Sequence, residues 1–315
     1  MPYDLTEPLV IGISSRALFN LEAENRIFEE EGLDAYMAYQ KAHENDTLPK
    51  GSAFQLVKAF LRLNKPGEKK MVEVIIMSRN SPETSLRIFK SVQDYNLDIT
   101  RAALVSGAEM TPYLKAFKTD LFLSAHAPDV NQAVDHDIAA GHIVTGSCPA
   151  NEKIDQIRIA FDGDAVLFAA ESERIYKTRG LEAFMEHETS HADDPLPRGP
   201  FANFLMTLSN LQSQFKTREE SPIRTALVTS RSIPAHKRAI KTLQDWNVRV
   251  DEAFFLGGVS KKEILSAFGA HIFFDDQDTH LSESSKYVPA GKVPYHSNSQ
   301  INEVIKAKND KKAAE

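Results

Sequence analysis

The chain repeats itself along its length. The segment EGLDAYMAYQKAHENDTLPKG, which ends at Gly51, matches RGLEAFMEHETSHADDPLPRG, which ends at Gly199, at an offset of 148 residues. Further on, the segments that begin at Ser78 and Ser230 match at an offset of 152 and then 151 residues, starting from a shared Ser-Arg dipeptide. Blocks that recur in one order at a near-constant spacing indicate that two halves share one fold. We therefore predict two copies of one domain, arising from an internal duplication, with a boundary near residue 150.

Each half alternates short apolar runs with amphipathic helices. The second half has four apolar runs with the composition of buried parallel strands, at 157–161, 225–228, 252–256 and 271–274. Helices are expected between them, one opened by Pro234 and another over Lys261–Phe268. This order predicts an α/β fold with a doubly wound parallel sheet, whose sites lie at the carboxyl ends of the strands.

The pattern divides the chain into three segments. We expect a first lobe at 1–150 with a cap insert at about 22–70, and a second lobe at 151–283 with a cap insert at about 170–222. The remaining residues, 284–315, are expected to form an extended and poorly ordered C-terminal tail.

Composition excludes several classes of protein. The 315 residues are 42% hydrophobic and 26% charged, as in globular proteins, and the net charge of −7 disfavours a nonspecific nucleic-acid binder. The sole cysteine, Cys148, allows no internal disulfide and no cysteine-rich zinc site. The beginning of the chain does not resemble a signal peptide, and no run approaches the roughly 18 apolar residues of a membrane helix. We expect a cytoplasmic protein without a membrane partner.

Polar side chains gather at one predicted edge of the second lobe, at strand ends and at the start of a helix. They belong to Asp162, Asp164, Thr229, Ser230, Arg231, Lys261, Asp275 and Asp276, with Gly163 between the first two aspartates. This set suits phosphoryl transfer through an aspartyl-phosphate, in which one carboxylate attacks phosphorus and Mg²⁺ held by carboxylates offsets the anionic repulsion. A hydroxyl and a lysine hold the phosphoryl oxygens, while a second acid protonates the leaving alkoxide and then activates water.

The motifs FDGDAVLF, ALVTSR and HIFFDDQ, with a lysine before the last helix, resemble the four motifs of the haloacid dehalogenase-like phosphatases. Together with SRALF, SRNSPE, EHE and DEAFFLGG, they make roughly residues 8–282 similar to the cytosolic type I 5′-nucleotidases. The resemblance implies two haloacid dehalogenase-like lobes and Mg²⁺-dependent hydrolysis of nucleoside 5′-monophosphates, with AMP as the usual substrate.

The resemblance also implies a role for each matched residue. Asp162 is the nucleophile and Asp164 the general acid/base, while Thr229 and Lys261 bind the phosphoryl group, with Lys262 as an alternative to Lys261. The predicted metal ligands are Asp162, Asp164, Asp275 and Asp276. The predicted substrate contacts are Gly163, Ser230, Arg231, His187 and Arg198. Arg231 could instead brace its turn, and Arg198 could lie in a solvated cap turn.

A competing motif lies in the cap of the second lobe. His187, Glu188 and His191 form H-E-x-x-H, the pattern of zinc proteases. In the first copy only the second histidine is kept, as His43, so the shared part of the motif reflects the repeat and not metal binding. We therefore expect the polar end of a cap helix rather than a zinc site.

The first lobe lacks the catalytic groups. Opposite the six catalytic and metal-binding residues of the second lobe stand Ser14, Arg16, Met77, Met110, Ser124 and Ala125. We predict either a scaffold that packs on the second lobe, which is slightly favoured, or a cationic crevice that binds a nucleotide effector without cleaving it. The residues of that crevice would be Ser14, Ser15, Arg16, Arg79 and Asn80.

The sequence thus predicts a 5′-nucleotidase, with two alternatives. One is a phosphatase of the same mechanism that acts on another small phosphate ester, such as a sugar phosphate. The other is a nucleotide-binding regulator without catalysis, which is disfavoured because the second lobe keeps all four motifs.

Overall fold

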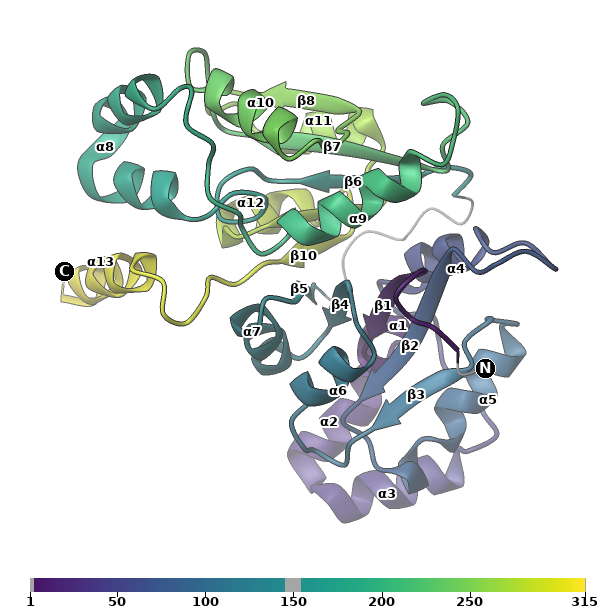
Figure 1. Cartoon of the computed structure of the whole chain (residues 1–315). Coiled ribbons are helices and arrows are strands. Elements are labelled where there is room, and N and C mark those ends of the chain that lie inside the picture. The colour runs from purple at the N-terminus through teal and green to yellow at the C-terminus, as the bar shows by residue number, and fades with distance from the viewer. Residues whose placement is uncertain (1–2, 145–153, 315) are drawn as a thin grey trace.

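The computed structural model describes residues 3–144 and 154–314, which form one ten-stranded sheet with helices on both faces (Figure 1). The strands are β1 (Leu9–Ile13), β2 (Val72–Ser78), β3 (Arg101–Leu104), β4 (Leu121–Ser124), β5 (Ala139–Ile143), β6 (Ile157–Phe161), β7 (Ile223–Thr229), β8 (Glu252–Phe255), β9 (Ile272–Asp275) and β10 (Ala290–Lys292). Their order across the sheet is β3-β2-β1-β4-β5-β10-β9-β6-β7-β8. The predicted α/β class with a mostly parallel sheet is confirmed.

The two halves of the sheet meet at β5 and β10. Read inward from its outer edge, each half has the same strand order, β3-β2-β1-β4-β5 in one and β8-β7-β6-β9-β10 in the other. The strands within each half are parallel, whereas β5 and β10 are antiparallel, with Gly291 opposite Ile143 and Lys292 opposite His142. The strand direction therefore reverses at this seam, and the carboxyl ends of the two halves point to opposite edges of the sheet.

Thirteen α-helices lie within the described residues. They are α1 (Ser15–Leu18), α2 (Glu22–Glu31), α3 (Leu33–Ala42), α4 (Phe54–Leu61), α5 (Leu86–Asp94), α6 (Thr111–Ala116), α7 (Ala127–Asp135), α8 (Glu171–Ser190), α9 (Ala202–Gln212), α10 (His236–Asp245), α11 (Lys261–Phe268), α12 (Asp278–Ser284) and α13 (Ile301–Ala314), with a 3-10 turn, η1, at Pro82–Thr84. None of these helices has the length and apolar character needed to cross a membrane.

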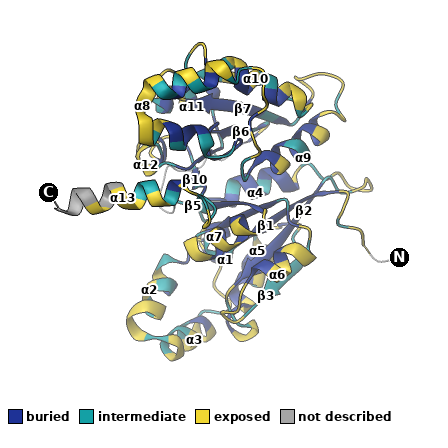
Figure 2. Ribbon diagram, turned by 60° about the vertical axis from the view of Figure 1, so that its left-hand side comes forward, coloured by how far each residue is buried: buried dark blue, intermediate teal, exposed yellow. Residues whose placement is uncertain are grey.

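One apolar core runs across both halves on one face of the sheet. The helix α4 of the first half contacts β6 of the second, and α9 of the second contacts β5 of the first (Figure 2). At the seam the buried ring of Phe274 packs against Phe161 and Phe201, with ring centroids 5.8 and 4.6 Å away. A Cβ atom at Gly141 or Gly291 would come within 2.8 Å of that ring, so both positions need glycine. The halves therefore share their packing rather than fold as separate cores.

The segments predicted as cap inserts contain two helices that pack in the core. In each half a glycine with positive φ separates two helical pieces, Gly32 between α2 and α3 and Gly180 inside α8. The expected inserts at about 22–70 and 170–222 also included α4 and α9, which belong to the core. Burial of the apolar faces of these two helices, including Phe54 and Phe204, explains the difference.

The C-terminal tail is also different from the prediction. Instead of an extended and poorly ordered segment at 284–315, the chain forms β10, which pairs with both β9 and β5, and α13, which packs against α8 (Figure 1). The pairing with two neighbouring strands stabilises a strand of only three residues. The predicted boundary at 150 and Cys148 lie outside the described residues.

Candidate active site

Three buried carboxylates gather where two neighbouring strands end. Asp162 follows β6, Asp275 is the last residue of β9, and Asp276 comes next. One carboxylate oxygen from each of them lies within 4.8 Å of the other two. Because β6 and β9 are adjacent and parallel, their carboxyl ends bring together side chains that are far apart in the sequence.

Lys261, the first residue of α11, neutralises part of this charge. Its Nζ atom lies 2.8 Å from Oδ1 of Asp162 and 2.6 Å from Oδ2 of Asp275. Burial raises the pKa of Asp162 to about 7, against the lowering effect of Lys261. Burial acts in the same direction on Asp275, but Lys261 and His280 outweigh it and hold its pKa below the ordinary value. Lys261, and not Lys262, therefore supplies the ammonium group of the crevice.

Asp276 has one oxygen that the described residues leave unsatisfied. Its Oδ2 atom accepts a hydrogen bond from the hydroxyl of Tyr295, whereas the buried Oδ1 atom has no partner among the described residues. Burial, together with the carboxylates of Asp275 and Asp162, raises the pKa of Asp276 well above its ordinary value. An unpaired buried oxygen is costly, and three clustered carboxylates are the ligands that Mg²⁺ prefers, so these residues fit a divalent cation.

A chain of buried charges joins Asp164 to α8. Arg231 donates from Nε and Nη2 to the two oxygens of Asp164 at 2.8 and 2.7 Å, and from Nη1 to Glu188 of α8. Glu188 also accepts from Nη1 of Arg238 at 3.0 Å and from the hydroxyl of Ser172 at 2.8 Å. Burial opposes ionisation of Glu188, but Arg231, Ser172 and Arg238 hold its pKa below the ordinary value. The α8 helix is thus tied to the side chain of Asp164 through a single arginine.

The end of β7 adds a hydroxyl to the crevice. The buried Oγ1 atom of Thr229 accepts a hydrogen bond from the backbone N–H of Arg231 at 3.2 Å. A Cβ atom at Gly163 would lie 3.2 Å from this oxygen, so the backbone of Gly163 passes close to it. The crevice therefore combines carboxylates, an ammonium group and a hydroxyl, which are the groups that phosphoryl transfer needs.

Comparison with known proteins identifies the family of the chain. A sequence model of the family described as 5′-nucleotidase matches residues 1–300. The chain belongs to the 5′-nucleotidase family. Human cytosolic 5′-nucleotidase 1B is 38% identical over 288 residues, which cover 88% of this chain and 47% of the human protein. The chain thus spans about half the length of this curated relative, and no solved structure matches it. The resemblance to the cytosolic type I 5′-nucleotidases is confirmed.

In this member of the 5′-nucleotidase family, the H-E-x-x-H motif is engaged in contacts within the protein. The rings of His187 and His191 lie 4.3 Å apart, and Glu188 is held by Arg231 and Arg238. Within residues 3–144 and 154–314, the group suited to hold a metal is the aspartate cluster, not this motif.

Several predicted site residues lie outside the acidic cluster. The carboxylate of Asp164 faces Arg231 and does not join the other predicted metal ligands. Ser230 is exposed at the end of β7, and the exposed Arg198 lies 3.5 Å from Asn203. His187, on α8, directs Nε2 to Arg238 at 3.2 Å.

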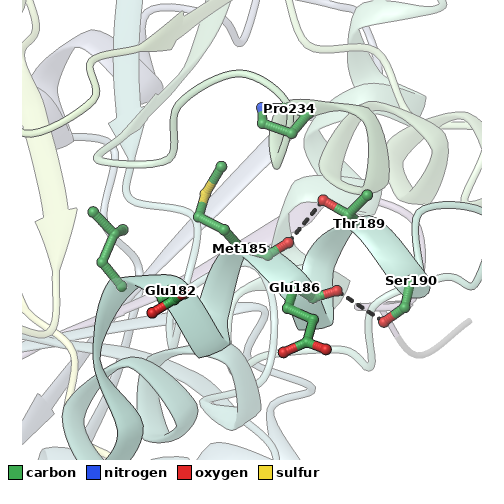
Figure 3. A pocket seen from close by; sticks show the side chains of 7 residues that line it. Glu182, Met185, Glu186, Thr189, Ser190 and Pro234 are labelled. Carbon is green, nitrogen blue, oxygen red and sulfur yellow. Dashed lines mark hydrogen bonds between the residues drawn. The ribbon is translucent and has the colours of Figure 1, made fainter.

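A separate open pocket of about 840 Å³ lies on the outer side of α8 (Figure 3). Residues between Leu181 and Ser190 line it together with Pro234. Phe184 and Glu188 of the same helix are buried on its inner side, and none of the residues of the acidic crevice lines the pocket. The pocket is therefore distinct from the crevice.

In the first half, the equivalent of Thr229 is Ser78 and not Met77. Both residues end their strands, and each hydroxyl accepts a backbone N–H two residues later at 3.2 Å, from Arg231 in one half and from Asn80 in the other. The predicted alignment of the two Ser-Arg dipeptides is thus wrong by one residue. The register of the strand pairs within each half gives the correct alignment, in which Asn80 is equivalent to Arg231.

The predicted effector residues lie together at the carboxyl edge of the first half, but their charges are already paired. Arg16 donates from Nη2 to Glu22 at 2.9 Å, and Arg79 donates from Nη1 to Asp129 at 2.8 Å. The remaining residues are also bonded, Ser14 to the backbone of Ala17, Ser15 to Ser78, and Asn80 to Tyr36. This arrangement resembles a braced turn more than an open cationic crevice.

Sequence reasoning missed several groups around the aspartates. His280 lies 3.1 Å from Oδ2 of Asp275, and Gln277 donates its backbone N–H to Oδ1 of the same residue at 2.8 Å. His280 could have been found, because it lies on the helix that follows the last motif. Tyr295 carries no comparable signal, since it lies in the segment expected to be poorly ordered.

Proposed function

We propose that the chain is a Mg²⁺-dependent 5′-nucleotidase that hydrolyses nucleoside 5′-monophosphates of the AMP type through an aspartyl-phosphate. The observation that carries the proposal is the cluster of Asp162, Asp275 and Asp276 around the ammonium group of Lys261. The family and the human relative, whose name is cytosolic 5′-nucleotidase 1B, favour a nucleotide as substrate and a cytoplasmic location.

Each residue of the crevice has a role in this proposal. Asp162 attacks phosphorus, while Lys261 and Thr229 hold the phosphoryl oxygens. When it is bound by Asp162, Asp275 and Asp276, Mg²⁺ supplies positive charge that offsets the repulsion between carboxylates and an anionic substrate. We propose no metal contact for the side chain of Asp164.

Asp164 is proposed as the general acid and base. Both oxygens of its carboxylate accept hydrogen bonds from the guanidinium of Arg231, so neither is free to face a leaving alkoxide. Substrate binding therefore has to loosen the contact between Asp164 and Arg231 before the first proton transfer. Because Arg231 also contacts Glu188, movement of α8 is a direct way to do this.

We further propose that the two halves are duplicated haloacid dehalogenase-like lobes, with the first serving as a scaffold. The matched strand order supports the duplication, as do contacts that recur at the offset of the repeat. Nε of Arg87 donates to the carbonyl of Asp46 at 3.0 Å, and Nε of Arg238 to that of Asp194 at 2.9 Å. The second lobe then extends from about 151 beyond residue 283, because β10 is its fifth strand.

The test is phosphate release from a panel of nucleoside monophosphates and sugar phosphates. We expect AMP to be among the best substrates, activity to be lost with EDTA and restored by Mg²⁺, and Asp162→Asn to abolish it. Asp245→Asn, which changes an exposed aspartate of α10, is the matched control. Preference for sugar phosphates would support the alternative phosphatase, and hydrolysis that survives in Asp162→Asn would rule out the aspartyl mechanism. Nucleotide binding without hydrolysis would identify a regulator.

A further inference from the structure

The C-terminal segment returns to the acidic crevice after it leaves the sheet. From β10 it continues past Tyr295 to α13, and α13 packs against α8. The tyrosine is only partly exposed, and its hydroxyl donates to Oδ2 of Asp276. A segment distant from the sequence motifs thus reaches one of the carboxylates proposed to hold the metal.

Tyr295 is itself held by the cap. Nζ of Lys177, on α8, lies 3.3 Å from the hydroxyl of Tyr295 and 5.7 Å from the centre of its ring. The same ammonium group lies 2.8 Å from Glu173, which accepts a hydrogen bond from the side chain of Gln277 at 3.0 Å. Gln277 directly follows Asp276, so these contacts close a loop around that aspartate.

The two oxygens of Asp276 have different surroundings. Oδ2 is occupied by Tyr295, whereas Oδ1 is buried and has no partner within the described residues. Asp276 also supplies an oxygen to the cluster with Asp162 and Asp275. A hydrogen bond that holds one oxygen fixes the rotation of the carboxylate and thereby directs the other oxygen.

We propose that Tyr295 is a positioning residue for the metal site, which orients Asp276 for a divalent cation and links that site to α8 through Lys177. The proposal rests on the function proposed above, because it assumes that the three aspartates hold the metal. Groups that hydrogen-bond to metal ligands typically change metal affinity by about 10- to 100-fold when they are removed. Tyr295 does not contact the reacting atoms in this proposal, so its loss should act on metal binding before it acts on chemistry.

The experiment measures Mn²⁺ binding by electron paramagnetic resonance, which detects the free ion without any turnover. Tyr295→Phe removes the hydroxyl but keeps the ring that packs on Lys177, and Tyr287→Phe makes the same change at a tyrosine that is 52% exposed. Asp276→Asn identifies the binding that belongs to the aspartate cluster. We expect Tyr295→Phe to raise the Kd for Mn²⁺ about 10-fold, and Tyr287→Phe to leave it unchanged.

A second measurement separates positioning from a general loss of structure. The Mg²⁺ concentration that gives half-maximal activity should rise about 10-fold in Tyr295→Phe, while kcat at saturating Mg²⁺ stays close to that of the wild type. If Tyr295→Phe binds Mn²⁺ as tightly as the wild type does, the role of Tyr295 is overturned while the proposed function stands. If the wild type does not bind Mn²⁺, or if its Mn²⁺ binding persists in Asp276→Asn, both proposals fail.

Discussion

Replacing Glu188 by glutamine tests the buried charge chain between α8 and Asp164. The substitution keeps the size of the side chain but removes the negative charge that lies between Arg231 and Arg238. Removal of one partner from a buried ion pair costs about 3–5 kcal/mol. Arg231 keeps its contacts with Asp164, so we expect the lower end of this range, about 3 kcal/mol of unfolding free energy.

The first half of the chain suggests how to restore that stability. Glutamine already stands at the equivalent position there, since Gln40 lies 148 residues before Glu188. On the two helical pieces of the first half the buried acid is Glu24, 148 residues before Ser172, and it lies 2.6 Å from Nη1 of Arg87. Each half has two helical pieces separated by a glycine, and the acid lies on the first piece in one half (Glu24) and on the second in the other (Glu188). In either place it pairs with an arginine at the equivalent position, Arg87 or Arg238.

The double variant Ser172→Glu/Glu188→Gln should therefore be more stable than Glu188→Gln alone. Ser172 touches Glu188 in the wild type, so a carboxylate introduced there can reach Arg238. We expect recovery of about 2 kcal/mol of the loss, measured by urea unfolding of the wild type, both single variants and the double variant. Ser172→Glu alone should be destabilising, because the new carboxylate would lie next to that of Glu188 and repel it. A double variant no more stable than Glu188→Gln would refute the equivalence of the two charge placements.

Three further predictions follow from other contacts. Arg16→Ala should leave the response of activity to added nucleotides unchanged, because Arg16 is already paired with Glu22; a weakened response would instead favour an effector site. Gly141→Ala should lower the unfolding free energy by about 1–3 kcal/mol, since its Cβ would press on the buried ring of Phe274, and wild-type urea stability would contradict the packing described at the seam. Burial, aided by Arg158, lowers the pKa of His271 to about 4 in the folded protein. The unfolded chain therefore binds the proton more readily, and the unfolding free energy should decrease as the pH falls from 6.5 to 4. We expect a loss of about 1–2 kcal/mol, less than the full pKa shift would give, because the half-buried ring is partly screened by solvent. His271→Asn should lose less stability over that range, and parallel losses in both proteins would be inconsistent with this assignment.

The sequence predicted the parts of the fold that follow from local pattern. Apolar runs located β6, β7, β8 and β9 of the second half to within about two residues, and the helix predicted over Lys261–Phe268 has these bounds. Parallel strands necessarily end together, so the cluster of Asp162, Asp275 and Asp276 could be anticipated from the order of the motifs.

The sequence did not predict features that depend on pairing between distant segments. The three residues of β10, Ala290–Lys292, are too few to form a recognisable apolar run. Their position as a strand depends on pairing with β5, which lies far away in the sequence. The register error at Ser78 has a similar origin, because a shared dipeptide suggested one alignment while hydrogen bonds between strands impose another. Tyr295 was missed because its role depends on the path of the tail through space.

The antiparallel seam has a consequence for which strand edges the sheet leaves unpaired. An unpaired strand edge exposes donors and acceptors that can recruit another chain. Pairing β5 with β10 covers one such edge in each half. A fragment that stopped before residue 284 would lack β10, and the facing edges of both β5 and β9 would then be unpaired. The strands that remain at the margins, β3 and β8, are only four residues long and carry Arg101 and Glu252, each in an ion pair. The strand β10 thus covers a sheet edge of each half as well as completing the fold.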